Sequence, residues 1–165
     1  MSSSKSTDRN ELFPVFLKLN ELHTLLVGAG NVGLEKLSAV LANSPGAKVT
    51  VVSETVSRDL QALAHEYPSV TVIKKTFQPA DLDNIDLVIV ATNNSEVNQQ
   101  VKMEARKRRL LVNVADKPAL CDFYLGSIVQ KGELKIGIST NGKSPTVAKR
   151  LKEVLSEALP GELEE

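Results

Sequence analysis

The sequence has one cysteine, no tryptophan and few aromatic residues, and its charges cancel. The lone Cys121 excludes a disulfide within the chain and any zinc or iron–sulfur site built from several cysteines. Lys and Arg together number 20, as do Asp and Glu, so the chain lacks the basic excess typical of proteins that bind bulk nucleic acid. With 4% aromatic residues the core must be aliphatic, which suits a buried parallel sheet.

Long apolar runs are also absent. No segment approaches the roughly 20 apolar residues of a membrane span, and residues 1–10 carry no apolar stretch typical of a secretory signal. We therefore expect a cytoplasmic protein with no membrane partner. Its 165 residues fit one ordinary domain with a short appended element.

Short apolar runs alternate with segments of helical periodicity between residues 22 and 114. The predicted strands are 22–27, 48–52, 70–73, 86–91 and 110–114, and the predicted helices are 31–43, 57–66 and 95–108. This alternation implies right-handed crossovers and a parallel sheet with helices on both faces. The sequence thus predicts an α/β fold of Rossmann type. We expect the apolar segment Phe13–Leu17 to pack on the sheet or pair with it.

The pattern changes after residue 115. Residues 127–129 and 134–138 are predicted to form a β-hairpin joined by a four-residue loop, 130–133, that contains glycine. A helix from Pro145 to Leu159 follows, with Ser144 as its N-cap and Pro145 at its first position.

Residues 28–33 read Gly-Ala-Gly-Asn-Val-Gly and lie between a predicted strand and a predicted helix. In a dinucleotide-binding loop Gly28 permits the tight turn, Gly30 lets the backbone approach the pyrophosphate, and Gly33 lets the helix pack closely on the strand. The helix N-terminus then offers N–H donors to the phosphates. The alternative is a plain tight turn, but the surrounding strand–helix–strand pattern favours a dinucleotide site.

The second strand leads into Ser53, Glu54 and Thr55. Glu54 lies 21 positions after Gly33, where a carboxylate accepting from the ribose 2′-hydroxyl is expected, although Ser53 or Thr55 remains an alternative for that contact. No arginine follows immediately to receive a 2′-phosphate, so NAD is favoured over NADP.

The fourth strand leads into Thr92 and Asn93. Ligands of such sheets bind beyond the carboxyl ends of the strands, so these residues are predicted to line the ribose or nicotinamide of the cofactor. The alternative is capping of the next helix by Asn93, Asn94 or Ser95.

Asp116 is the ionisable residue best placed for catalysis, because it follows the fifth strand at the edge where the crevice is expected. Both histidines are poorly placed, His23 within a strand and His65 on an outer helix. The alternative for Asp116 is a turn aspartate before Lys117 and Pro118.

Taken together, the segments FPVFLKL, LLVGAGNVG, ATNNSEVN, NVADKP and STNGKSPTVAKRL give the chain a close resemblance to the precorrin-2 dehydrogenase family, which includes the N-terminal half of bacterial siroheme synthase. The resemblance runs from Phe13 to Leu159. It implies NAD-dependent oxidation of precorrin-2 to sirohydrochlorin in siroheme biosynthesis and, in some relatives, insertion of Fe²⁺ afterwards.

By the same resemblance Asp116 is the general acid–base, Asn31 and Val32 are cofactor contacts of the glycine loop, and Glu54 with Thr55 follow the second strand. The protein is expected to be a homodimer. The implied organisation is a disordered lead-in at 1–12, the NAD-binding Rossmann domain at 13–115, a dimerisation segment at 116–143 and a C-terminal helix at 144–165. The resemblance leaves the metal ligands unassigned.

Precorrin-2 carries many carboxylates, so its site needs local positive charge. Lys149 and Arg150 lie on the helix that Ser144 caps, and that helix N-terminus also attracts anions. We expect Ser144, Lys149 and Arg150, together with Asn113 beside the predicted catalytic residue, to contact the substrate. The alternative is a solvated helix face. The basic run 106–109 complements a helix dipole and is assigned to structure.

Two other functions stay open. One is a non-catalytic dimeric module that responds to NAD or NADH, which would need neither a general base nor a cationic cleft. The other is a chelatase acting mainly in metal insertion.

Overall fold

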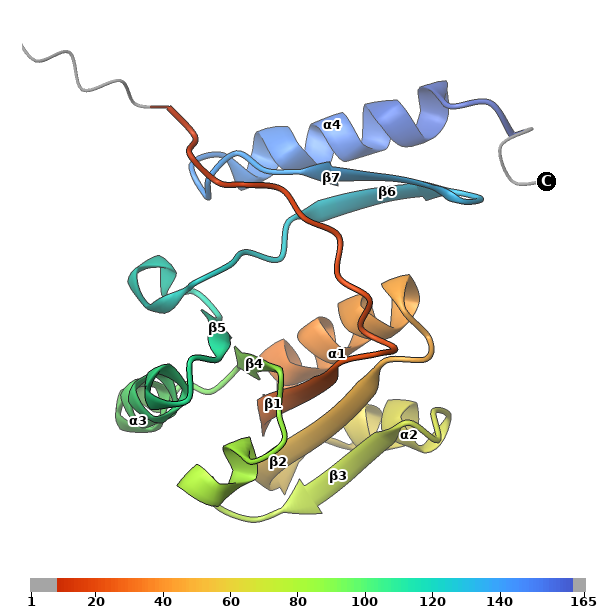
Figure 1. The fold of residues 1–165 in the computed structure, drawn as a ribbon. Coiled ribbons are helices and arrows are strands. Elements are labelled where there is room, and N and C mark those ends of the chain that lie inside the picture. Colours follow the sequence, from red (N-terminus) through yellow and green to blue (C-terminus); the bar gives the residue numbers. More distant parts are fainter. Residues whose placement is uncertain (1–8, 162–165) are drawn as a thin grey trace, which may run out of the picture. The chain divides into compact units, whose positions relative to one another are not determined.

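The computed structural model describes residues 9–161, which form two compact units (Figure 1). We call Leu17–Tyr124 the sheet unit and residues 9–16 with 125–161 the hairpin unit. Most of the predicted lead-in and the end of the predicted C-terminal segment lie outside the described residues. Within the described range, every helix is too short or too polar to cross a membrane.

The sheet unit is a five-stranded parallel sheet of order β3-β2-β1-β4-β5, which confirms the Rossmann-type prediction. Its strands are β1 His23–Ala29, β2 Lys48–Val56, β3 Val70–Lys74, β4 Leu87–Val90 and β5 Leu111–Val114. Its helices are α1 Asn31–Asn43, α2 Arg58–His65 and α3 Ser95–Lys107, with short 3-10 turns η1 Pro79–Leu82 and η2 Pro118–Leu120.

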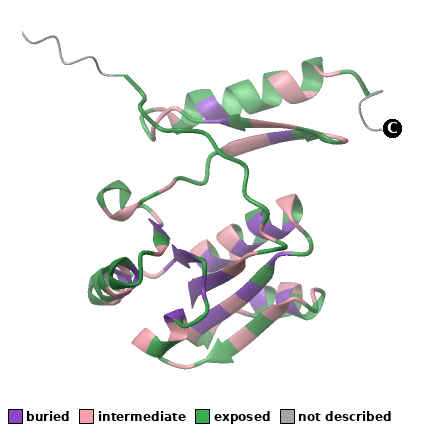
Figure 2. Cartoon of the chain, viewed as in Figure 1, coloured by how far each residue is buried: buried purple, intermediate pink, exposed green. Residues whose placement is uncertain are grey.

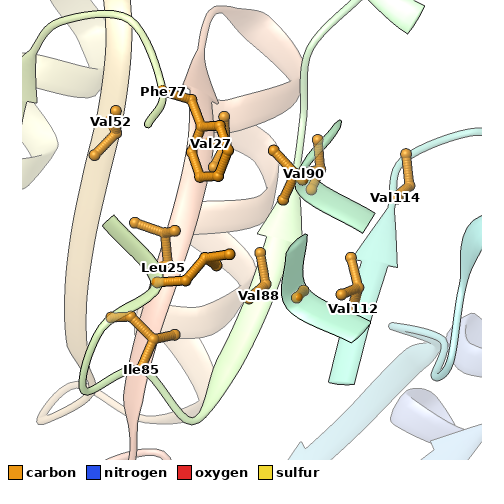
Figure 3. Close-up of a cluster of buried hydrophobic side chains, with 12 residues drawn as sticks. Leu25, Val27, Val52, Phe77, Ile85, Val88, Val90, Val112 and Val114 are labelled. Atoms are coloured by element: carbon orange, nitrogen blue, oxygen red, sulfur yellow. The ribbon is translucent and has the colours of Figure 1, made fainter. Parts of the chain in front are cut away.

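Both faces of this sheet are buried. Successive side chains of a strand point to opposite faces, and each set packs in its own apolar cluster. Leu26 and its neighbours pack against α1 and α2, while Leu25 and its neighbours form the cluster of Figure 3, which includes Val101 of α3. Each fully buried Leu or Val contributes on the order of 2 kcal/mol. The continuous apolar runs of the sequence are explained by this two-sided burial.

The hairpin unit contains β6 Ser127–Lys131, β7 Leu134–Ile138 and α4 Pro145–Ala158. Its buried core consists only of Val129, Ile138 and Ala148, and Figure 2 shows α4 largely exposed. Ser144 caps α4 by accepting from Val147 N–H at 3.4 Å, as predicted.

The structure corrects three local predictions. The hairpin loop has two residues rather than four, because Lys131 pairs with Leu134. β2 continues to Val56 instead of ending at Val52. Segment 13–17 forms no strand, so the expectation that it pairs with the sheet is wrong, and all its side chains are exposed, with Phe13 at 87% and Phe16 at 75%. Apolar composition alone does not reveal which surface a segment covers.

Candidate functional site

The glycine loop closes the carboxyl end of β1 so tightly that two of its glycines are required. Gly28 has φ +104°, and a Cβ added there would collide with the carbonyl oxygen of Ala91. A Cβ on Gly33 would collide with the carbonyl oxygen of Gly28. The loop therefore brings β1, α1 and the end of β4 into contact, as a dinucleotide-binding loop requires.

Gly30 is different, because it faces open space. A Cβ added there would find no atom within 4 Å, and Gly30 caps α1 without a side-chain hydrogen bond. The other α-helices of the described chain each have a side-chain cap, provided by Ser57, Asn94 and Ser144. The first turn of α1 thus keeps its N–H donors, including those of Asn31 and Val32, for an anionic ligand.

The carboxyl end of β2 bulges beside this loop. Val27 pairs with Val52 and Ala29 with Val56, so Ser53, Glu54 and Thr55 stand opposite Gly28 alone. The Thr76 hydroxyl donates to Glu54 Oε1 at 2.7 Å and so holds this exposed carboxylate. All three predicted ribose contacts lie on the bulge.

After β4, the two predicted cofactor contacts have different surroundings. Thr92 Oγ1 donates to Asn98 Oδ1 at 2.6 Å and accepts from Asn94 N–H at 3.2 Å, so this hydroxyl is used within the protein. Asn94 caps α3 by accepting from the N–H groups of residues 96 and 97, which realises the capping alternative at this position. Asn93 remains exposed at the sheet edge.

Asp116 lies just beyond β5 at the same edge of the sheet. The preceding residue, Ala115, donates its N–H to Val90 O at 2.9 Å, which ties this turn to the end of β4. Asp116 itself is exposed with φ +58°, and its carboxylate makes no hydrogen bond within residues 9–161. It is available to a ligand, as a general base must be.

Asn113 is 5% exposed, and its Nδ2 donates to Phe123 O at 2.9 Å. Its Oδ1 accepts from none of the described residues. The amide nitrogen therefore has a structural partner, while a substrate contact stays a prediction for Oδ1.

The remaining predicted substrate contacts belong to the hairpin unit. Ser144 Oγ is used in capping α4. Arg150 pairs with Glu153 on the same helix at 3.2 Å, the arrangement of a solvated face. Lys149 is exposed and pairs with no carboxylate of the described chain.

Several residues that shape the site were not singled out by the sequence patterns. Thr76 holds Glu54, and Asn98, 2% exposed on α3, binds Thr92 through both ends of its amide. A polar residue at an inward position of α3 was a visible signal for Asn98. The described residues include no group of three His, Cys, Asp or Glu side chains that could hold a metal ion.

Two family models match the chain. Residues 15–127 match the family described as putative NAD(P)-binding, and residues 131–157 match the family described as sirohaem biosynthesis protein central. The first match spans the glycine loop and Asp116, and the second spans β7 and most of α4.

The chain is also similar to individual proteins. It is 38% identical to siroheme synthase 1 of Cronobacter sakazakii over 93% of its length and 37% identical to siroheme synthase of Methylobacillus flagellatus over 91%. It spans only 32% of each of these relatives. Among solved structures it matches SirC, precorrin-2 dehydrogenase, with TM-score 0.78 and 31% identity over 93% of this chain and 74% of that one.

Proposed function

The chain belongs to the family described as putative NAD(P)-binding and is similar to siroheme synthases and to SirC, precorrin-2 dehydrogenase, and from this premise we propose that it oxidises precorrin-2 to sirohydrochlorin with NAD as the hydride acceptor. The observation that carries the proposal is the exposed Asp116 carboxylate on the same sheet edge as the uncapped N-terminus of α1. One feature supplies a base and the other a place for the cofactor phosphates.

The residues present fit a dinucleotide. The space over Gly30 is open and the first turn of α1 is uncapped, so the backbone there is accessible to a phosphate group that an added Cβ would obstruct. We propose that the N–H groups of this turn hold the pyrophosphate and that the β2 bulge contacts the adenosine ribose. When bound, the nicotinamide supplies the hydride acceptor.

NAD rather than NADP is proposed because of Glu54. Thr76 holds its carboxylate beside the glycine loop, where it would accept from a ribose 2′-hydroxyl and repel a 2′-phosphate. The exposed Arg58 opens α2 nearby and is the residue that would favour NADP. Comparison of kcat/KM for the two cofactors in the wild type and in Glu54→Gln tests which of them prevails.

Asp116 is proposed as the general base. Oxidation removes a hydride from one atom of precorrin-2 and a proton from another, and the carboxylate accepts that proton. Its exposure leaves room for a large tetrapyrrole. Asn113, Ser144, Lys149 and Arg150 are proposed to bind the substrate, the two cations by pairing with its carboxylates.

We further propose that the protein is a homodimer that pairs through the hairpin unit. Val147, Leu151 and Val154 recur on α4 at helical spacing and are 43–56% exposed. An apolar stripe of this kind is typical of a face covered by a partner. Sedimentation should give a dimer for the wild type and a monomer for Leu151→Glu, whereas a wild-type monomer would refute the proposal.

The decisive experiment is anaerobic incubation with precorrin-2 and NAD, following NADH absorbance and the sirohydrochlorin spectrum. We expect both signals from the wild type and neither from Asp116→Asn, which should still bind NAD. Full activity of Asp116→Asn would refute the role of Asp116. NAD binding by a wild type that turns over no precorrin-2 would instead favour the NAD(H)-responsive module, and addition of Fe²⁺ to the product tests chelation.

A matched pair of glycine variants tests the cofactor site. Gly30→Ala should fold normally but bind NAD at least about tenfold more weakly, because the new methyl group occupies the space proposed for the pyrophosphate. In Gly46→Ala the added Cβ meets only Asn20 Cβ at 3.6 Å, an ordinary contact, so affinity should be unchanged. Equal NAD affinity in both variants would refute the placement.

A further inference from the structure

The outer edge of β5 is covered by the residues that follow η2 and not by another strand. Val112 donates its N–H to Asp122 Oδ2 at 3.0 Å and accepts from Asp122 N–H at 2.7 Å. Val114 donates its N–H to Cys121 Sγ at 3.2 Å, and the thiol lies 3.1 Å from Val114 O as a donor. Asp122 thus bonds to the backbone N–H and carbonyl of Val112, and Cys121 bonds to those of Val114.

These contacts close a loop whose apex carries Asp116. The loop begins at Val114 and ends at Cys121, and the Cys121 thiol also lies 3.4 Å from Lys117 O. A hydrogen bond from Lys117 N–H to Val114 O at 3.2 Å closes the turn that contains Asp116. Asp116 is therefore fixed from both sides of its own turn.

An ion pair anchors the closing residues to α3. Lys102 Nζ lies 2.6 Å from Asp122 Oδ2, the same oxygen that accepts from β5, and the Lys102 side chain is only 12% exposed. The hydrogen bond from Asn113 to the carbonyl of Phe123 continues the attachment. Burial raises the pKa of the Cys121 thiol, which keeps the S–H that donates to β5.

The backbone of Asp116 shows why such an anchor is needed. Its φ of +58° lies in the left-handed region, which is uncommon for a residue with a Cβ although Asp adopts it more readily than most, and the surrounding turn helps to hold it there. The carboxylate itself makes no hydrogen bond in the described chain, so its direction depends on the backbone.

We propose that Asp122 and Cys121 are positioning residues that hold the turn closed and so direct the Asp116 carboxylate into the active site. The proposal rests on the proposed role of Asp116 as general base. A positioning role differs from a merely structural role, such as protection of a sheet edge. Loss of either side chain should lower the catalytic rate only by moving Asp116. A misplaced catalytic group costs rate without loss of cofactor binding.

The test uses the full chain, four variants of the anchor and one control variant. Asp122→Ala and Cys121→Ala remove the side-chain bonds to β5 and leave the backbone bond from Asp122 N–H to Val112 O, whereas Asp122→Asn and Cys121→Ser keep a side-chain group that accepts from the same N–H. Asp86→Ala is the matched control, because Asp86 Oδ2 accepts from His23 N–H at 2.8 Å at the amino end of the sheet. Precorrin-2 turnover and NAD affinity are measured for each, and NMR couplings report the φ of Asp116.

We expect kcat to fall about tenfold or more in both Ala variants with NAD affinity unchanged, and to recover in the Asn and Ser variants. Asp86→Ala should keep wild-type kcat.

Wild-type kcat in both Ala variants would overturn the positioning role. If the wild type turns over no precorrin-2, the proposed function fails instead. The NMR measurement then still decides, because a φ of Asp116 that stays positive in both Ala variants overturns the inference and a lost positive φ supports it.

Discussion

The two units of this chain differ in how much buried packing each has within itself. The sheet unit buries both faces of its sheet between helices, with Leu25, Val51 and Val88 fully inaccessible. The hairpin unit buries three residues and leaves the stripe of α4 exposed. The first unit can fold by its own packing, whereas the second has little packing of its own, which agrees with the proposal that it pairs with a second copy.

This difference agrees with a division between the tasks proposed for the two units. The glycine loop, the β2 bulge and Asp116 all belong to the sheet unit. The exposed apolar stripe and the candidate cations Lys149 and Arg150 belong to the hairpin unit. Cofactor binding should therefore depend on one unit, and assembly on the other.

The largest expected effect comes from producing the units as separate fragments. Residues 17–124 should fold cooperatively and bind NAD, because they contain their own two-sided core. Residues 125–161 should be unfolded, since chains below about 40 residues rarely fold without disulfides, metals or oligomerisation. Circular dichroism and NAD calorimetry measure both outcomes. A stably folded monomeric 125–161 fragment would contradict the comparison.

Truncation of one leucine in each unit should sharpen the comparison between the units. Leu26→Ala, at 1% exposure in the sheet unit, should lower the free energy of unfolding by about 2–5 kcal/mol. Leu151→Ala, at 43% exposure, should cost less than about 0.5 kcal/mol when measured at a concentration where the protein is monomeric. Urea unfolding at that concentration provides both values, and equal losses would contradict the prediction.

Thiol chemistry should report on the sheet unit alone. Burial raises the pKa of Cys121, so iodoacetamide at pH 8 should react about tenfold more slowly than with the urea-unfolded chain. A raised folded pKa stabilises the fold below the unfolded thiol pKa, and this contribution is lost as the pH rises through the folded value. The alkylation rate should therefore climb at higher pH in the native protein than in the unfolded one.

The smallest effect concerns the surface of α3. A hydrogen bond from Lys107 lowers the pKa of Glu104 below its ordinary 4.5 against the opposing effect of burial, with Arg108 assisting. This carboxylate stabilises the sheet unit above its unfolded pKa, and the contribution disappears as the pH falls through the lowered folded value. The stability difference between the wild type and Glu104→Gln should be small at pH 7 and vanish near pH 2. A constant difference would argue against a charge effect.

Elements with strong periodicity were predictable from the sequence. The limits of α1 agree with the prediction, because Gly30 and Asn43 bound a clear apolar face. β2 was predicted too short, because the polar residues Ser53 and Glu54 are not typical of a buried strand. In the structure they continue β2 as a bulge. Local pattern cannot reveal a register shift that depends on Gly28 in another strand.

The same limit applies to the site. Gly28 and Gly33 were predictable because their roles follow from position in a strand–turn–helix unit. Thr76 and Asp122 were not, because each acts on a residue of a different element, Glu54 and Val112. Polar loop residues gain such partners only in the fold. The exposure of Phe13 was also not predictable, because the apolar character of a residue does not show which surface, if any, covers it.

The mutual contact of Gly28 and Gly33 has a consequence for the thermodynamics of cofactor binding. Because each position excludes even a methyl group, the loop has little conformational freedom left to lose when a ligand arrives. Binding to such a preorganised loop carries a small ordering entropy, so even a modest number of phosphate contacts can yield useful affinity.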